Sequence, residues 1–417
     1  MADSPRVGHT DSIASQDSGS KGTEKKKSRR PANTAFRQQR LKAWQPILTP
    51  KTVLPLFFSI GIIFAPIGGL LLYASSQVQE LVIDYTKCTE LAPNSTTNWD
   101  PVPNDYVSSQ FKNKTSLNTQ WRQESINLTY DNVDTAAQNC IIQFEIPEDM
   151  GPPVLFYYQL TNFYQNHRRY VQSFDPKQLV GTGGYTNSSV NSDCQPLQKD
   201  TDGKPYYPCG LIANSIFNDT FSNLTIVGSS GSNYTMSETG IAWNSDKSLY
   251  KKLPSDIDLD SLAVPPNWVV RYPNGYTTAN PPPDVRSDEH FIVWMRTAAL
   301  PDFSKLYMRN DDTKLAKGQY QVEITNLFPA EIYKGTKSMV ISTRTVLGGR
   351  NPFLGIAYVV VGGICIVLGV LFTVTHLLKP RKLGDHTYLS WNNAPASKPG
   401  ASSGMASGRD LGPQGQA

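Results

Sequence analysis

The sequence predicts a two-pass membrane protein, in which two transmembrane helices enclose a large β-rich ectodomain. We expect this ectodomain to be an antiparallel β-sandwich with irregular insertions and a few short helices. Residues 53–76 and 352–378 are uncharged apolar runs, long enough as helices to cross a hydrocarbon core about 30 Å thick. The 77–351 segment between them holds four of the five cysteines and seven Asn-x-Ser/Thr sequons. Both features are typical of a segment outside the cytosol.

Basic residues flank both spans. The chain has 11 Lys or Arg against 4 Asp or Glu before Val53, and 5 against 2 after Leu378. The positive-inside rule therefore places both termini in the cytosol and residues 77–351 on the exoplasmic side. No nucleic-acid-binding module accompanies the basic residues.

The two ends of the chain differ in character. Residues 1–35 are polar and should be a disordered cytosolic tail. Residues 36–52 form a juxtamembrane segment, either a short interfacial helix carrying Trp44 or an irregular basic linker. The apolar run after them is too long for a cleavable signal, so we expect a signal-anchor. Residues 379–417 form the cytosolic C-terminal tail.

Each span carries a packing signal. Pro66 in the first span lacks a backbone donor and should kink the helix. The second span repeats glycine every seven residues, at Gly355, Gly362 and Gly369. Such a stripe lets a second helix approach closely, although membrane helices are also rich in glycine generally.

The four external cysteines predict two disulfides, with three possible connectivities. Pairing in sequence order closes the shortest loops, and no CxxC or HxH spacing suggests a metal site. Cys365, in the second span, is expected to be a small apolar helix residue. The four external cysteines are Cys88, Cys140, Cys194 and Cys209.

The sequons predict N-glycosylation. All lie between the spans and none in the tails, a distribution that chance would rarely produce. The acceptors are Asn94, Asn113, Asn127, Asn187, Asn218, Asn223 and Asn233.

Six segments rich in β-branched and aromatic residues predict strands, and their long connections favour an antiparallel sandwich. An insert at about 175–260 would form an outer lobe. A short helix over 163–171 would follow a cap at Thr161 or Asn162. The six predicted strands are residues 140–146, 153–160, 267–272, 290–298, 318–328 and 337–346.

No catalytic set emerges from the ectodomain, and we expect no cofactor or metal. His167 would tuck against the sheet while Arg168 and Arg169 meet carboxylates. The KGTK sequence at Lys334 lacks the Ser-x-x-Lys partner of an acyl-transferase. Asp288 and the residue after it would point to opposite faces of a strand, which argues against acid–base chemistry.

Several long blocks resemble the ligand-effect-modulator, or cell-division-control-fifty, family. The resemblance runs from about Phe36 to Trp391, and the four external cysteines are similar to its fungal branch. The blocks are FRQQRLKAWQPILTP (36–50), NFYQNHRRYVQSFD (162–175), PCGLIANSIFNDT (208–220), GIAWNSDKSLYKK (240–252), DEHFIVWMRTAALPDFSKLY (288–307), KGTKSMVISTRTVLGGRNPFLG (334–355) and PRKLGDHTYLSW (380–391).

The resemblance implies a non-catalytic accessory (beta) subunit of a type IV P-type ATPase. The partner would move phospholipid from the exoplasmic to the cytosolic leaflet, and the subunit would support its folding, its exit from the endoplasmic reticulum and its activity. The pair would act between the endoplasmic reticulum, Golgi, endosome and plasma membrane. The resemblance also implies bridges Cys88–Cys140 and Cys194–Cys209. The alternative is a stand-alone two-pass glycoprotein receptor or adhesion protein.

Overall fold

The computed structural model describes residues 33–41, 49–112, 117–228, 233–344 and 349–380. The chain divides into two units, which are residues 56–374 and the two chain ends. The first unit contains the sheets, the lobe and most of both long helices.

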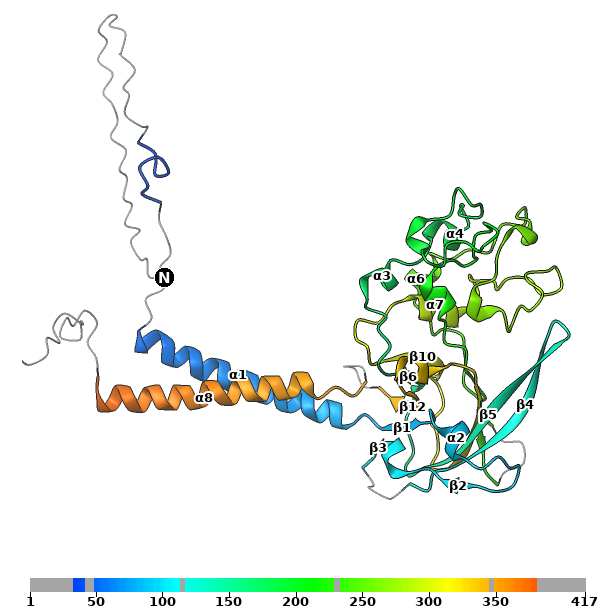
Figure 1. Ribbon diagram of the computed structural model, residues 1–417. Coiled ribbons are helices and arrows are strands. Elements are labelled where there is room, and N and C mark those ends of the chain that lie inside the picture. Colours follow the sequence, from blue (N-terminus) through cyan, green and yellow to red (C-terminus); the bar gives the residue numbers. More distant parts are fainter. Residues whose placement is uncertain (1–32, 42–48, 113–116, 229–232, 345–348, 381–417) are drawn as a thin grey trace, which may run out of the picture. The chain divides into compact units, whose positions relative to one another are not determined.

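Two long apolar helices begin and end the described fold. They are α1 (Pro50–Ser76) and α8 (Phe353–Leu378), and each is long and apolar enough to cross a membrane. Most of their side chains are exposed to the surroundings, as expected for helices that face lipid rather than a protein core. The chain is therefore a two-pass membrane protein, and the two helices pack side by side (Figure 1).

The first sheet has five antiparallel strands in the order β10-β6-β12-β1-β3. Its middle strand β12 and the neighbouring strand β1 connect directly to the spans, because β1 follows α1 and β12 precedes α8 along the chain. The strands are β1 (Glu80–Asp84), β3 (Val107–Gln110), β6 (Val154–Leu160), β10 (Phe303–Asn310) and β12 (Lys337–Thr343).

The second sheet has seven strands in the order β2-β4-β5-β11-β8-β9, with β7 also paired to β11. Its longest hairpin, β4 to β5, closes through Asp131 and Asn132, both with positive φ, in the two-residue turn that suits a twisted hairpin. The strands are β2 (Asp100–Pro101), β4 (Gln120–Tyr130), β5 (Val133–Ile146), β7 (Thr220–Phe221), β8 (Leu224–Ile226), β9 (Asn233–Tyr234) and β11 (Gly318–Asn326).

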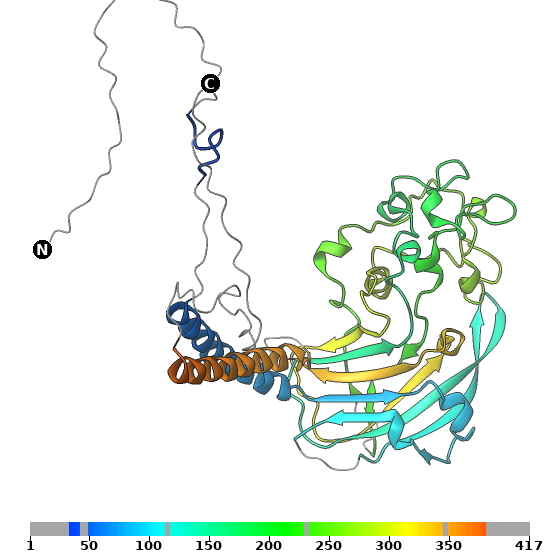
Figure 2. The ribbon, with the colours of Figure 1, turned by 60° about the vertical axis from the view of Figure 1, so that its left-hand side comes forward.

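The core lies between the two sheets. Alternate residues of each strand point inward, so Ile83 and Phe156 of the first sheet share one buried cluster with Ile142, Phe144 and Val322 of the second. This is the antiparallel β-sandwich predicted from the sequence. Figure 2 shows the strands running away from the helices.

The remaining chain forms short helices, most of them in a lobe of irregular loops. The short helices are α2 (Cys88–Leu91), η1 (Asn104–Tyr106), α3 (Arg168–Val171), α4 (Pro176–Val180), η2 (Ser192–Cys194), α5 (Leu211–Asn214), α6 (Asn244–Lys247), η3 (Leu259–Ser261), η4 (Pro266–Trp268), α7 (Glu289–Met295) and η5 (Ala330–Tyr333).

Two of the predicted strands are wrong. Residues 290–298 lie mostly in helix α7, because Asp288 accepts a hydrogen bond from the Phe291 amide and caps the first turn. Residues 267–272 contain the end of the 3-10 helix η4 and the turn after it, with Trp268 and Tyr272 both buried. Short apolar runs fit a buried helix as well as a strand, and local capping decides between them.

Candidate functional site: the helix pair and the buried ion pair

The glycines of the second span lie against the first span of the same chain. A Cβ added at Gly355 would lie 2.8 Å from Leu72 Cγ, and one at Gly362 would lie 2.9 Å from the Ala65 backbone nitrogen. A Cβ added at Gly369 would lie 3.2 Å from the Phe58 ring. Because no real Cβ sits closer than about 3 Å to such atoms, glycine is what allows this approach.

The first span contributes glycines of its own. A Cβ at Gly61 would lie 2.5 Å from Ile366 Cγ1, and one at Gly68 would lie 2.7 Å from the Val359 backbone nitrogen. Their neighbour Gly69 faces open space. The glycine stripe is thus used inside the chain, where it joins α1 to α8.

Pro66 is exposed on α1, and the helix continues through it from Pro50 to Ser76. A kink at this residue stays a prediction.

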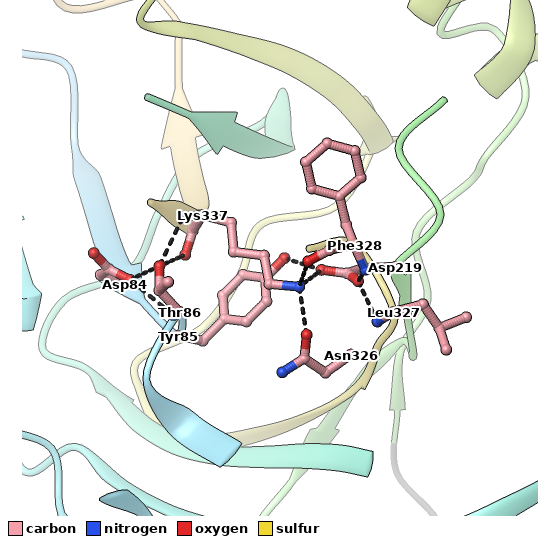
Figure 3. A network of polar contacts seen from close by, with 8 residues as sticks. All are labelled: Asp84, Tyr85, Thr86, Asp219, Asn326, Leu327, Phe328 and Lys337. Atoms are coloured by element: carbon pink, nitrogen blue, oxygen red, sulfur yellow. Dashed lines mark hydrogen bonds and ion pairs between the residues drawn. The ribbon is translucent and has the colours of Figure 1, made fainter. Parts of the chain in front are cut away.

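A buried ion pair lies at the far end of the first sheet. Lys337 Nζ and Asp219 Oδ2 are 2.7 Å apart, and their side chains are 3% and 0% exposed. Asp219 precedes β7, and Lys337 is the first residue of β12 (Figure 3).

Asp219 accepts four hydrogen bonds. Its Oδ1 accepts the amides of Leu327 and Phe328, both at 2.6 Å, and its Oδ2 accepts the Tyr85 hydroxyl at 2.9 Å besides the lysine. These four donors compensate the buried carboxylate for the water that it has lost.

The Lys337 ammonium group, like the Asp219 carboxylate, has a full set of hydrogen-bond partners. Its Nζ donates to Asp219, to the Phe328 carbonyl at 2.6 Å and to the Asn326 side-chain oxygen (Figure 3). Burial lowers the pKa of Lys337, and the Asp219 carboxylate opposes that shift. Burial likewise raises the pKa of Tyr85 well above its usual range.

This network joins three distant parts of the chain. Tyr85 follows β1, Asp219 precedes β7, and Lys337 begins β12. The Lys337 amide also donates to Thr86 Oγ1 at 2.8 Å, which in turn donates to Asp84 at 2.6 Å. Every charged atom of the ion pair is engaged by the protein, so the network holds the fold together and offers no free group for catalysis.

This ion pair was not predicted from the sequence, where KGTK was considered only as a possible acyl-transferase signature. In the structure Lys334 has φ 54°, and Gly335 lies so close to Thr161 that a Cβ would fall 2.0 Å from its carbonyl oxygen. The available signal was a lysine at the first position of an otherwise uncharged strand.

Two disulfides join Cys88 to Cys140 and Cys194 to Cys209. The first ties α2 to β5, and the second closes a loop within the outer lobe. Cys365 is a free, buried cysteine of α8.

The described sequon asparagines are all exposed at the surface, whereas Asn113 lies outside the described residues. The exposed acceptors are Asn94, Asn127, Asn187, Asn218, Asn223 and Asn233.

The charged residues near 167 and 288, which the sequence analysis considered for chemistry, do not form a catalytic arrangement in the described structure. His167 is exposed, so the prediction that it tucks against the sheet is wrong, and the helix there spans only 168–171. Asp288 caps α7, while Glu289 accepts the Ala242 amide at 2.9 Å and pairs with Lys247 at 2.6 Å. Across the parts of the chain that the structure describes, no group of three His, Cys, Asp or Glu side chains could hold a metal ion.

Residues 71–382 match the LEM3 (ligand-effect modulator 3) family / CDC50 family. The chain belongs to this family. The match begins near the end of the first span and includes both sheets, the ion pair and the second span.

Relatives within the LEM3/CDC50 family align over most of their length. The phospholipid-transporting ATPase accessory subunit CDC50 of Chaetomium thermophilum is 44% identical, with 88% of this chain and 92% of the relative covered. The accessory subunit CRF1 of Saccharomyces cerevisiae is 42% identical, with 88% and 90% covered. Cell cycle control protein 50A of Bos taurus is 39% identical, with 84% and 89% covered.

Proposed function

We propose that this chain is a non-catalytic accessory subunit of a type IV P-type ATPase that moves phospholipid from the exoplasmic to the cytosolic leaflet. One observation carries the proposal. Relatives that align with nearly the whole chain are named accessory subunits of phospholipid-transporting ATPases. Their names favour this function over a stand-alone receptor or adhesion protein.

The architecture is compatible with a supporting role. The glycine-packed helix pair leads directly into two adjacent strands, β1 and β12, of a sandwich that a disulfide and a buried ion pair brace. Such a unit has few ways to deform, and a rigid unit can hold the external loops of a partner in one arrangement.

We further propose that both termini are cytosolic and that the sandwich is exoplasmic and glycosylated. Cleavage of the glycans by an N-glycosidase should lower the apparent mass of the chain isolated from its own cells. Each asparagine-to-glutamine variant at an exposed sequon should reduce this loss of mass by the mass of one glycan. A mass unaffected by the enzyme would contradict the exoplasmic placement.

The proposal also includes a role in folding and export of the ATPase, so the pair would leave the endoplasmic reticulum together and act at the Golgi, endosomes or plasma membrane. Without this chain, the catalytic subunit should remain in the endoplasmic reticulum. A catalytic subunit that reaches its destination normally in such cells would contradict this part.

The deciding experiment is a pull-down of the tagged full chain in mild detergent, followed by mass spectrometry and a phospholipid-stimulated ATPase assay. We expect a stoichiometric P-type ATPase whose turnover rises with one phospholipid headgroup. A folded, glycosylated chain recovered alone and without ATPase activity would overturn the proposal.

A further inference from the structure

We infer that the membrane-side end of the sandwich carries a cationic collar that binds the phosphate groups of phospholipids in the adjoining leaflet. The collar consists of Lys112, Lys317, Arg344 and Arg350, all exposed. The inference goes beyond the proposed function and is independent of it, because it requires only that the chain is inserted in a membrane by its two spans.

Short connections hold this end of the sandwich at the membrane. Helix α1 ends at Ser76 and β1 begins at Glu80, so at about 3.6 Å per residue the strand starts within roughly 14 Å of the span. The Asn351 amide, just before α8, donates to Ser75 Oγ at 3.1 Å. Both spans therefore meet the sandwich at one place.

Strand register puts two of the cations at that place. Glu80 pairs with Gln110 of β3 and with Ser342 of β12, and both of these strands run antiparallel to β1. Lys112 and Arg344 each lie two residues further along, beyond the first residue of β1 and toward the spans.

The other two cations are tied to the same end. Gln79, just before β1, donates to Glu148 Oε1 at 2.8 Å and to the Asp149 carbonyl at 3.1 Å. Asp149 in turn accepts the Lys317 amide at 2.8 Å. Arg350 lies three residues before the first residue of α8.

Two exposed aromatic side chains mark the membrane boundary independently. Tyr73, in the last turn of α1, is 65% exposed, and Phe353, the first residue of α8, is 74% exposed. Tryptophan and tyrosine are enriched at the edge of the hydrocarbon core, next to the lipid headgroups, so Tyr73 indicates this level on α1. On the other span, Arg350 of the collar lies only three residues before Phe353.

The collar cations are available for a ligand. Two nearby carboxylates already have other partners, since Asp149 binds Lys314 at 2.6 Å and Glu148 accepts the Lys112 amide at 3.1 Å. For a third, Glu80, burial raises the pKa of the carboxyl, and the Arg350 guanidinium is near enough to oppose that rise. Within the described parts of the chain, none of the four collar side chains forms an ion pair. The segment between the spans is acidic as a whole, yet these four basic residues lie at its membrane-side end. Lysine and arginine at this level fit lipid phosphate, and the guanidinium can bind it with two parallel hydrogen bonds.

The test uses the full chain alone in phosphatidylcholine nanodiscs that contain a phospholipid with a photoactivatable headgroup. Illumination followed by peptide mass spectrometry measures how much probe attaches to the collar peptides. A second probe carries the same photoactivatable group on a glycolipid without phosphate. We expect at least tenfold more attachment from the phospholipid, because only this probe has a phosphate that the four cations can bind through charge-assisted hydrogen bonds.

A collar variant with all four residues changed to glutamine should lose at least tenfold of the attachment. The matched control changes to glutamine two exposed lysines and two exposed arginines of the segment between β9 and β10, and it should attach the probe normally. The control residues are Lys251, Lys252, Arg271 and Arg286.

Equal attachment of both probes, or full attachment to the collar variant, would overturn the inference. If the collar variant does not fold, the single variants K112Q and K317Q and a titration of the native chain with salt replace it. Attachment should then fall severalfold per variant and decline as salt approaches about 1 M, where exposed charges are screened within about 3 Å. No change in either measurement would also overturn the inference. Because no ATPase is present, the result is separate from that of the pull-down.

Discussion

Replacing Lys337 with methionine should destabilise the sandwich by about 3–5 kcal/mol. The variant keeps the volume of the side chain but leaves Asp219 buried, at 0% side-chain exposure, without its cation. It also leaves the Phe328 carbonyl and the Asn326 side-chain oxygen without their donor. For a fold of this size, such a loss lowers the melting temperature by about 6–20 °C.

The assay is thermal unfolding of the full chain in nanodiscs, followed by circular dichroism of the β-sheet signal. The matched control is Lys314→Met, which removes the exposed pair with Asp149, where the lysine is 62% exposed. Exposed pairs contribute about 0–1 kcal/mol, so this variant should melt within a few degrees of the native chain.

A double variant separates the cost of the unpaired charge from the cost of lost packing. Changing Asp219 to asparagine together with Lys337→Met removes both charges while the asparagine oxygen still accepts the Leu327 and Phe328 amides. It should recover most of the lost stability. If Lys337→Met melts within 2 °C of the native chain, the ion pair does not brace the fold.

Three further residues, Gly362, Lys305 and Gly335, lead to testable predictions. Gly362→Leu should separate α1 from α8 and lower the yield of folded chain, whereas Gly363→Leu should be tolerated because Gly363 faces open space. Cross-linking between cysteines placed on the two helices would measure their separation. Equal cross-linking in both variants would contradict the packing of the two helices. Burial lowers the pKa of Lys305 to about 7, so between pH 7 and 9 the unfolded chain binds a proton that the folded chain has released. The free energy of unfolding should therefore rise by up to about 2–3 kcal/mol over that range in urea titrations, and Lys305→Met should abolish the rise. Gly335→Ala should cost more than about 2 kcal/mol, because the new Cβ would fall 2.0 Å from the Thr161 carbonyl oxygen; native-like melting would show that the loop can shift.

Much of the fold could be predicted because its signals are local. The spans are recognisable by their length and lack of charge, and the strands at 153–160 and 318–328 by their composition. The structure has them at Val154–Leu160 and Gly318–Asn326. The helix α7 was missed because its apolar run is as short as a strand, and only the Asp288 cap distinguishes it.

Polar strands escaped prediction for a different reason. β4 (Gln120–Tyr130) is rich in glutamine, serine and asparagine, and it is a strand because β5 pairs with all eleven of its residues. β10 carries Lys305 and Arg309, which composition alone would assign to a loop. Pairing with distant residues overrides local preference in such strands.

Part of the candidate site could also be predicted from the sequence, and part could not. The glycine spacing predicted close helix packing, but it could not say that the second helix belongs to the same chain. The pair of Asp219 and Lys337 was invisible because 118 positions separate the two residues. A charged residue in an apolar strand shows that a counter-charge is needed, but only the fold shows which residue provides it.

The position of β1 between β3 and β12 determines when the first sheet can be completed during synthesis. Gln79 donates to Thr343 across 264 positions, so β1 meets its main partner only when nearly the whole ectodomain has been made. At 5–20 residues per second, this interval is roughly 10–50 s. The β4–β5 hairpin can form early in that time, while one edge of β1 waits unpaired beside the membrane. Nascent chains of this protein should therefore depend on lumenal chaperones until β12 emerges and closes the sheet.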